Sequence, residues 1–180
     1  MTRGSNGGVS NNLEANFVVK ILKTFSHRYG NVRNIDIGVI SFYNDQVAMI
    51  KDKLKDRDLL RWMNSNNVSL QVSTVDGFQG CEKDIIILSC VRSKWTGRPA
   101  KNDIGFLKDF RRVNVALTRA KHSLWVVAHC DALNKDALWS ALINDASSRK
   151  LIAEGAHLAQ YTGEESPRNE QTKRKGKRLR

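Results

Sequence analysis

The sequence has 180 residues, of which 41% are hydrophobic, so it is long enough to bury a core and is most simply one domain. No apolar run approaches the roughly 20 residues that a membrane span needs, and no secretory signal opens the chain, so we expect neither a membrane nor a secreted protein. The net charge of +12 suits a polyanionic partner, while three widely spaced cysteines and four scattered histidines indicate a reducing compartment and no metal site.

Residues 1–11 are mostly glycine, serine and asparagine and predict a flexible lead-in. From Asn12 onward, apolar residues recur on one helical face, and Asn11 or Asn12 is the expected N-cap. This helix is expected to end shortly before the turn at Gly30. Residues 35–41 are rich in branched side chains and predict the first strand.

A second amphipathic helix is predicted from about Asn44. Residues 56–67 are polar and irregular, and residues 68–73 predict the next strand. The apolar run at 85–91 predicts another strand. Between these two strands lies the sequence TVDGFQGCEKD at 74–84, whose glycines and small polar residues could present backbone N–H groups to a phosphate or a ribose. An ordinary connection with glycine turns is the alternative interpretation.

Residues 94–109 contain glycines and a proline and predict a surface loop. The stretch 111–129 begins as a basic helix and leads into a short apolar strand at 124–128, which we expect to be covered on both faces. Arg119 is expected in the last turn of that helix, close to a sheet edge where a phosphate could sit. A solvated charge that stabilises the helix dipole is the alternative interpretation.

A last helix is predicted after Asp131 or Asn134, either of which could be its N-cap. We place the folded domain at 12–155 and expect 156–180 to form a disordered basic tail. Six of the eight residues at 173–180 are lysine or arginine, so half of the +12 excess belongs to this tail. Such a tail is typical of a nuclear-localisation or nucleic-acid-binding patch, and a solvated tail without a partner is the alternative.

Strands that alternate with helices, each strand being almost wholly apolar, predict an α/β fold with a parallel sheet and helices on both faces. Right-handed crossovers bring strand-end loops to one edge of such a sheet. The loop that begins at Thr74 and the turns around Phe42 and Arg119 are therefore expected to share an edge. Doubly wound sheets bind their ligands at such an edge.

Three longer motifs occur in a fixed order: GVISFYNDQV at 38–47, STVDGFQGCEKDIIILSCVRS at 73–93 and IGFLKDFRRVNVALTRAKHSLWVVA at 104–128. Together with SNNLEANFVVKIL at 10–22, they resemble the second RecA-like motor domain of superfamily 1 helicases. Within that superfamily the sequence is most similar to the branch of senataxin and the nonsense-mediated-decay helicase. The resemblance covers roughly residues 10–145 and implies a RecA-like, P-loop-NTPase-type sheet.

The resemblance implies that four residues take part in nucleotide binding. Arg119, in LTRA, matches the arginine finger that reaches the γ-phosphate of ATP, and we expect it to be catalytic. Glu82 matches a carboxylate at the ribose or near the phosphates. Gln79 and Gly80 match the loop that couples the state of the nucleotide to the grip on nucleic acid.

Four other residues are implied to contact nucleic acid. Ser73 and Thr74 match positions that hydrogen-bond its backbone, and Tyr43 and Gln46 match the motif after the first strand. The family usually has proline before this tyrosine, where this chain has Phe42, which alters the expected local backbone.

Arg111 and Asn114 are expected to position the finger helix. For Arg92 a phosphate contact and a structural salt bridge are equally open.

The implied cofactors are ATP and Mg²⁺, shared with a first motor domain. The 180 residues contain no GxxxxGK[ST] motif and no acidic strand-end pair for Mg²⁺, so the predicted fold lacks its own P-loop. We therefore expect a fragment or an isolated domain of a larger helicase, inactive by itself. Its expected partners are single-stranded RNA or DNA and a first RecA-like domain in cis or in trans, with no membrane, in the nucleus or otherwise the cytoplasm.

Two other functions remain open from the sequence. The chain could be a non-catalytic nucleic-acid-binding module, or a regulatory module that docks on the first domain of a partner. The helicase interpretation depends on Arg119, which must be neither sealed inside the core nor turned away from Glu82.

Overall fold

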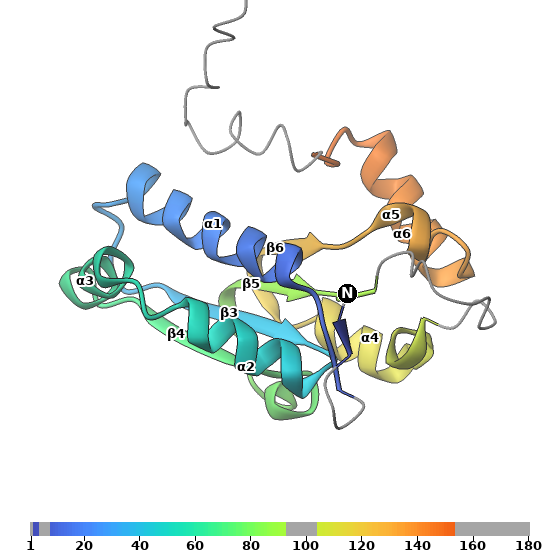
Figure 1. Ribbon diagram of the computed structural model, residues 1–180. Helices are drawn as coiled ribbons and strands as arrows, with labels where there is room; N and C mark the ends of the chain where they lie inside the picture. Colours follow the sequence, from blue (N-terminus) through green and yellow to red (C-terminus); the bar gives the residue numbers. More distant parts are fainter. Residues whose placement is uncertain (1, 4–7, 93–103, 154–180) are drawn as a thin grey trace, which may run out of the picture.

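The computed structural model describes residues 2–3, 8–92 and 104–153 (Figure 1). The expected basic tail, most of the expected loop at 94–109 and much of the lead-in lie outside these described residues. The described part contains a four-stranded parallel sheet and a small antiparallel pair, β1 (Thr2–Arg3) with β2 (Val9–Ser10).

The main sheet has the strand order β4-β3-β5-β6. Its strands are β3 (Asp36–Ser41), β4 (Ser69–Thr74), β5 (Lys83–Ser89) and β6 (Ala120–Val127). All neighbouring strands run parallel, and Ile37 of β3 pairs with Leu70 of β4 on one side and with Ile85 of β5 on the other. The chain thus passes from the central β3 to β4 and then crosses back to β5, on the other side of β3, as in doubly wound folds. The predicted α/β, RecA-like architecture is confirmed.

Three helices cover one face of the sheet: α1 (Asn12–Arg28), α2 (Asn44–Lys53) and α3 (Arg57–Ser65) (Figure 1). Their apolar sides pack on Ile37, Val39 and Ile87, which are alternate residues of β3 and the matching residue of β5. Successive residues of a strand point to opposite faces of the sheet, so these helices contact every second residue of a strand. Each such fully buried aliphatic side chain contributes about 1.5–3 kcal/mol to stability.

The second face carries shorter elements: the 3-10 turns η1 (Asp76–Phe78) and η2 (Gly105–Lys108), and the helices α4 (Phe110–Leu117), α5 (Cys130–Leu133) and α6 (Ala137–Ser148). They pack on Ile40, Ile86 and Leu88 in a second core. The buried Trp139 of α6 donates its indole N–H to the carbonyl oxygen of Leu107 at 2.9 Å, which fastens η2 to this layer.

The connection from β4 to β5 crosses this second face through η1 without an α-helix. It passes over β3 at Gly38, where an added Cβ would lie 2.8 Å from the ring of Phe78 and 2.5 Å from the side chain of Ile86. The missing side chain lets the wholly buried Phe78 pack directly on the sheet. Because β5 runs parallel to β4, this crossover carries the chain from the carboxyl ends of the strands back to their amino ends.

Most predicted elements have the expected positions, and Asn11 caps α1 by accepting from the N–H groups of Leu13 and Glu14. The region 56–67, however, is not irregular: it contains α3, whose N-cap is Asp56. This helix buries only two side chains, Leu59 and Trp62, so its sequence is mostly polar although its few apolar residues lie on one face.

The expectations for the C-terminal half need three corrections. The last strand, β6, begins at Ala120 and not near Leu124, and it is an edge strand that is only partly buried. The preceding helix ends at Leu117, so Arg119 lies after its last turn and not within it. The expected last helix is two helices, and the longer one is capped by Asp136.

The expected common edge is also wrong. Phe42 and Thr74 lie at the carboxyl ends of β3 and β4, whereas Arg119 immediately precedes the first residue of β6. Lys83 and Ala120, the first residues of β5 and β6, pair with each other. Arg119 therefore lies at the opposite end of the sheet from Thr74.

Candidate nucleotide and nucleic-acid interface

Arg119 occupies the short link between α4 and β6, and its side chain folds back over that link. Its Nε donates to the carbonyl oxygen of Val115 at 3.1 Å, and its Nη2 donates to the hydroxyl of Thr118 at 2.9 Å. Its Nη1 lies 3.5 Å from the carbonyl oxygen of Cys81. These three acceptors are neutral, and among the described residues no carboxylate pairs with Arg119. No acidic side chain in the described part of the chain therefore neutralises this partly buried guanidinium.

Glu82 and Arg119 are held close together by the backbone. The amide of Lys83, which follows Glu82, donates to the carbonyl oxygen of Arg119 at 3.0 Å. Glu82 is exposed, and the residue before it, Cys81, accepts from the Arg119 guanidinium. Arg119 is thus neither sealed in the core nor turned away from Glu82.

Gly80 precedes this pair in a conformation that favours glycine. Its φ is +77°, in the left-handed region, and an added Cβ would meet no atom within 4 Å. The backbone here is therefore open on its outer side. Gln79 ends the η1 turn, and its N–H donates to the carbonyl oxygen of Asp76. The four residues expected at the nucleotide thus lie in one region, at the amino ends of β5 and β6.

A second group lies at the other end of the sheet. Thr74 ends β4 and lines a hollow of about 150 Å³. The other lining residues are Phe42, Asn44, Val75, Asp76, Phe106 and Arg112. Ser73, the preceding residue, lies against Gly77 of η1. A Cβ added to Gly77 would be only 2.2 Å from the Ser73 hydroxyl oxygen. Thr74 therefore faces this hollow, while Ser73 packs against η1.

Tyr43 and Gln46 are buried and do not form part of this surface. Gln46 is 0% exposed, and its side chain accepts from the N–H of Asn11 at 2.7 Å and donates to the Asn11 carbonyl oxygen and to the hydroxyl of Ser89. The expected contact of Gln46 with nucleic acid is therefore not available, because its amide lies wholly inside. Tyr43 is also buried, and its hydroxyl accepts from Arg92 Nε at 2.8 Å. In this arrangement both residues position the backbone and side chains around them.

Arg92 had two open interpretations, and the structure gives it a third set of contacts. Its guanidinium lies over the ring of Tyr43, 5.3 Å from the ring centroid, besides donating to the Tyr43 hydroxyl. Gly105, with φ +61°, leaves room for it, since a Cβ there would lie 2.3 Å from Arg92 Nη2. Among the described residues Arg92 has no carboxylate partner, so the structural salt bridge is not observed there.

Sequence reasoning missed the role of Glu14. Its carboxylate is buried and accepts from the hydroxyl of Ser89 and from the N–H of Val91, each at 2.7 Å. Burial raises the pKa of Glu14 to about 7, although these hydrogen bonds act in the opposite direction. Val91 has a φ of +71°, rare for a branched residue, and Glu14 holds it there. The spacing of Asn11 and Glu14 is that of a capping box, which was the available signal.

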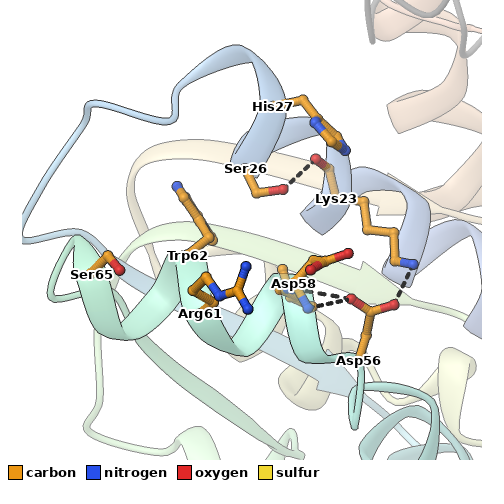
Figure 2. Close-up of a pocket in the computed structure, with 9 residues that line it drawn as sticks. Lys23, Ser26, His27, Asp56, Asp58, Arg61, Trp62 and Ser65 are labelled. Atoms are coloured by element: carbon orange, nitrogen blue, oxygen red, sulfur yellow. Dashed lines mark hydrogen bonds and ion pairs between the residues drawn. The ribbon is translucent and has the colours of Figure 1, made fainter.

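A larger hollow, of about 360 Å³, lies between α1 and α3 and contains none of the expected site residues. Figure 2 shows its lining, which includes His27, Arg61 and Trp62, and the ion pair of Lys23 with Asp56 at 2.5 Å. The hydrogen bond from Lys23 lowers the pKa of Asp56. The charges of both signs along this hollow indicate a solvated helix interface.

Comparison with known proteins decides the family. A family model described as an AAA domain matches residues 1–131. The chain belongs to this family. Similar proteins include "Helicase sen1" of Schizosaccharomyces pombe (40% identical, covering 87% of this chain and 9% of that protein) and "Probable helicase senataxin" of Homo sapiens (35%, 83% and 5%). "Regulator of nonsense transcripts 1 homolog" of Drosophila melanogaster is 38% identical, covering 85% of this chain and 12% of that protein.

These matches confirm the predicted resemblance: the chain is a C-terminal motor domain of a superfamily 1 helicase of the senataxin type. This helicase domain spans less than an eighth of the length of each of these three relatives. In the part of the chain that the structure describes, no helix is long and apolar enough to cross a bilayer.

Helicases of this family use ATP and Mg²⁺. The charged Arg119, the exposed Glu82 and the open backbone at Gly80 fit the phosphates and ribose of a nucleotide held from the other side. No group of three or more His, Cys, Asp or Glu side chains suited to a metal ion occurs within the described residues.

Proposed function

We propose that this domain supplies the arginine finger and part of the nucleic-acid track of an ATP-dependent RNA or DNA helicase. One observation carries the proposal. The Arg119 guanidinium has no carboxylate partner among the described residues, and it contacts the carbonyl oxygen of Cys81, the residue next to the exposed Glu82. A fixed cation beside an exposed carboxylate at the surface suits a ligand that has both phosphates and a ribose.

In this proposal ATP binds between this domain and a first motor domain, in cis or in trans. Arg119 exchanges its weak contact with Cys81 for the γ-phosphate oxygens, where its planar fork stabilises the charge of the transition state. Glu82 accepts hydrogen bonds from the ribose hydroxyls, and a bound Mg²⁺ would supply charge neutralisation at the phosphates. The energetic cost is low because the contact that Arg119 gives up is long, at 3.5 Å.

The two ends of the sheet are connected through η1 and α4. Arg112, in the first half of α4, donates to Asp76 of η1 at 3.0 Å. The same η1 turn leads to Gln79 and Gly80, and α4 ends next to Arg119. Movement of Arg119 or of the Gln79 turn on nucleotide binding therefore reaches the hollow at Thr74. We propose that this connection couples ATP binding to the grip on a single strand, whose backbone Thr74 and the neighbouring Ser73 contact.

The test is the ATPase rate of a two-domain protein in which the first motor domain of a relative precedes this chain. Arg119→Ala is expected to reduce the rate by about 10³- to 10⁵-fold, which is typical of an arginine finger. The matched control is Arg61→Ala, which removes an exposed arginine from α3. An Arg119→Ala protein as active as the control would refute the assignment.

The second candidate is a nucleic-acid-binding or regulatory module without catalysis. It is favoured by the net charge of +12, half of which lies at 173–180. We place such a chain in the nucleus because of these basic residues. In this case binding to a single strand survives Arg119→Ala and weakens on removal of 173–180. A module that docks on a first domain is recognised by pull-down with that domain, with and without nucleotide.

A further inference from the structure

Aromatic side chains are exposed beside the hollow at Thr74. Phe106 lines this hollow and is 51% exposed, although its neighbour Leu107 is wholly buried. Phe110, four residues later, is also exposed. Single exposed apolar side chains are ordinary, whereas aromatic side chains gathered at a hollow mark a candidate binding surface.

The ring of Phe106 is surrounded by other planar groups. Its centroid lies 5.6 Å from that of Tyr43, at an interplanar angle of 46°. The guanidinium carbon of Arg112 lies 5.0 Å from the Phe106 centroid. Aromatic rings and guanidinium planes are the two kinds of side chain on which nucleic-acid bases stack.

We propose that Phe106, with Arg112, is a stacking platform for one base of a single-stranded nucleic acid whose backbone passes Thr74. This inference rests on the proposed function, and it adds a residue that contacts a base to those that contact the backbone. The base lies in the hollow between the carboxyl ends of β3 and β4. Asn44, exposed at the start of α2, also lines that hollow, and its side-chain amide can donate to and accept from the edge of a base.

The charges of the hollow favour a base over a phosphate at this point. Arg112 is paired with Asp76 at 3.0 Å, so its charge is largely neutralised within the hollow. With these two charges paired with each other and Phe42, Val75 and Phe106 in the rest of the lining, the hollow suits the face of a base. The exposed Arg111 of α4 is then available to contact the negatively charged phosphate backbone of the nucleic acid.

The platform is held rigidly enough to act as a binding surface. The carbonyl oxygen of Leu107, next to Phe106, accepts from the buried Trp139 indole at 2.9 Å. On the other side, Gly105 adopts a φ of +61° and leaves space for the Arg92 guanidinium. Little conformational freedom is therefore left to lose when a base stacks, which favours affinity.

The test is binding of the full 180-residue chain to a short fluorescent single-stranded RNA, and to the same strand made abasic. Phe106→Ala is expected to weaken binding to the intact strand by about 5- to 100-fold and to leave binding to the abasic strand unchanged. Phe106→Trp is expected to bind the intact strand at least as well as the unchanged chain. The matched control is Tyr29→Ala, which removes an exposed aromatic side chain at the other end of the sheet.

A second readout separates stacking from a structural role. A strand with one fluorescent purine analogue is expected to lose emission on binding to the unchanged chain and to Phe106→Trp, but not to Phe106→Ala. Equal affinity of Phe106→Ala and the unchanged chain for the intact strand would overturn the stacking site and leave the proposed function standing. An equal loss on both strands would also overturn it. If the unchanged chain bound no strand at all, the nucleic-acid part of the proposed function would fail as well.

Discussion

The guanidinium Nη1 of Arg119 lies 3.5 Å from the carbonyl oxygen of Cys81, the residue immediately before Glu82. This contact joins the segment after α4 to the crossover that precedes β5. Two motifs 37 residues apart, at Glu82 and Arg119, therefore present their charged groups on one surface. The arrangement is already formed in the free domain, so under the proposed function a nucleotide held by a first motor domain would meet a prepared surface.

The buried Glu14 predicts that stability falls as the pH rises through the weakly acidic range. Its pKa is about 7 in the folded chain against 4.5 when it is free, so folding favours the protonated form. This contribution, about 3 kcal/mol in total, is complete below about pH 4.5 and is lost as the pH rises to and through about 7. Urea unfolding between pH 5 and pH 8 measures it.

Glu14→Gln is the control for that pH dependence. Glutamine has no titrating group, so the variant is expected to lose most of the decline between pH 5 and pH 7. It also keeps an oxygen that can accept from the N–H of Val91. A variant with the same pH dependence as the unchanged chain would show that Glu14 is not its source.

Gly38→Ala is expected to destabilise the fold. The new methyl would lie 2.5 Å from the Ile86 side chain and 2.8 Å from the Phe78 ring, both wholly buried. Overpacking of this kind typically costs about 1–3 kcal/mol. In the matched variant Gly80→Ala the added Cβ meets no atom within 4 Å. Its cost is the backbone strain of the positive φ alone, about 1 kcal/mol. Chemical denaturation should therefore rank Gly38→Ala as the less stable variant, and the reverse order would contradict the described crossover.

Asp76→Asn is expected to affect coupling more than stability. The Arg112–Asp76 ion pair is partly exposed, so its loss should change the free energy of unfolding by less than about 1 kcal/mol. It joins η1 to α4, however, so we expect nucleic acid to stimulate the ATPase of the two-domain protein less strongly. The measurement compares rates with and without a saturating single strand. Asp58→Asn, which removes an acidic group from α3, is the control, and equal stimulation in both variants would contradict this connection.

Removal of 173–180 is expected to weaken the salt dependence of binding to a single strand. Each lysine or arginine at a phosphate adds about 0.7 to the slope of log affinity against log salt concentration. With six such residues in the tail, the slope should fall by up to about 4. An unchanged slope would show that the tail does not contact the strand.

The sequence predicted the sheet and the helices α1 and α2 because long apolar patterns dominate those segments. It failed at α3, where burial of only Leu59 and Trp62 leaves a mostly polar pattern. It also failed at β6, because a run of apolar residues does not tell whether a strand lies inside a sheet or, as here, at its edge.

For the candidate site, the motifs predicted which residues occur together but not how each is exposed. Glu82 and Arg119 are neighbours as expected, while the crossover at η1 moves them away from Thr74. Gln46 could not be recognised as buried, because its partners Asn11 and Ser89 are 35 and 43 residues away. Phe106 gave no signal of its own, since exposure of a phenylalanine depends on the tertiary fold.

The most direct test of the central claim is single-turnover hydrolysis of ATP already bound to the two-domain protein, with a separate measurement of ATP affinity. The account predicts that Arg119→Ala slows the hydrolysis step by at least about 10³-fold, that Arg119→Lys restores only part of the rate, and that ATP affinity falls far less. Hydrolysis by Arg119→Ala at the rate of the unchanged protein would contradict it.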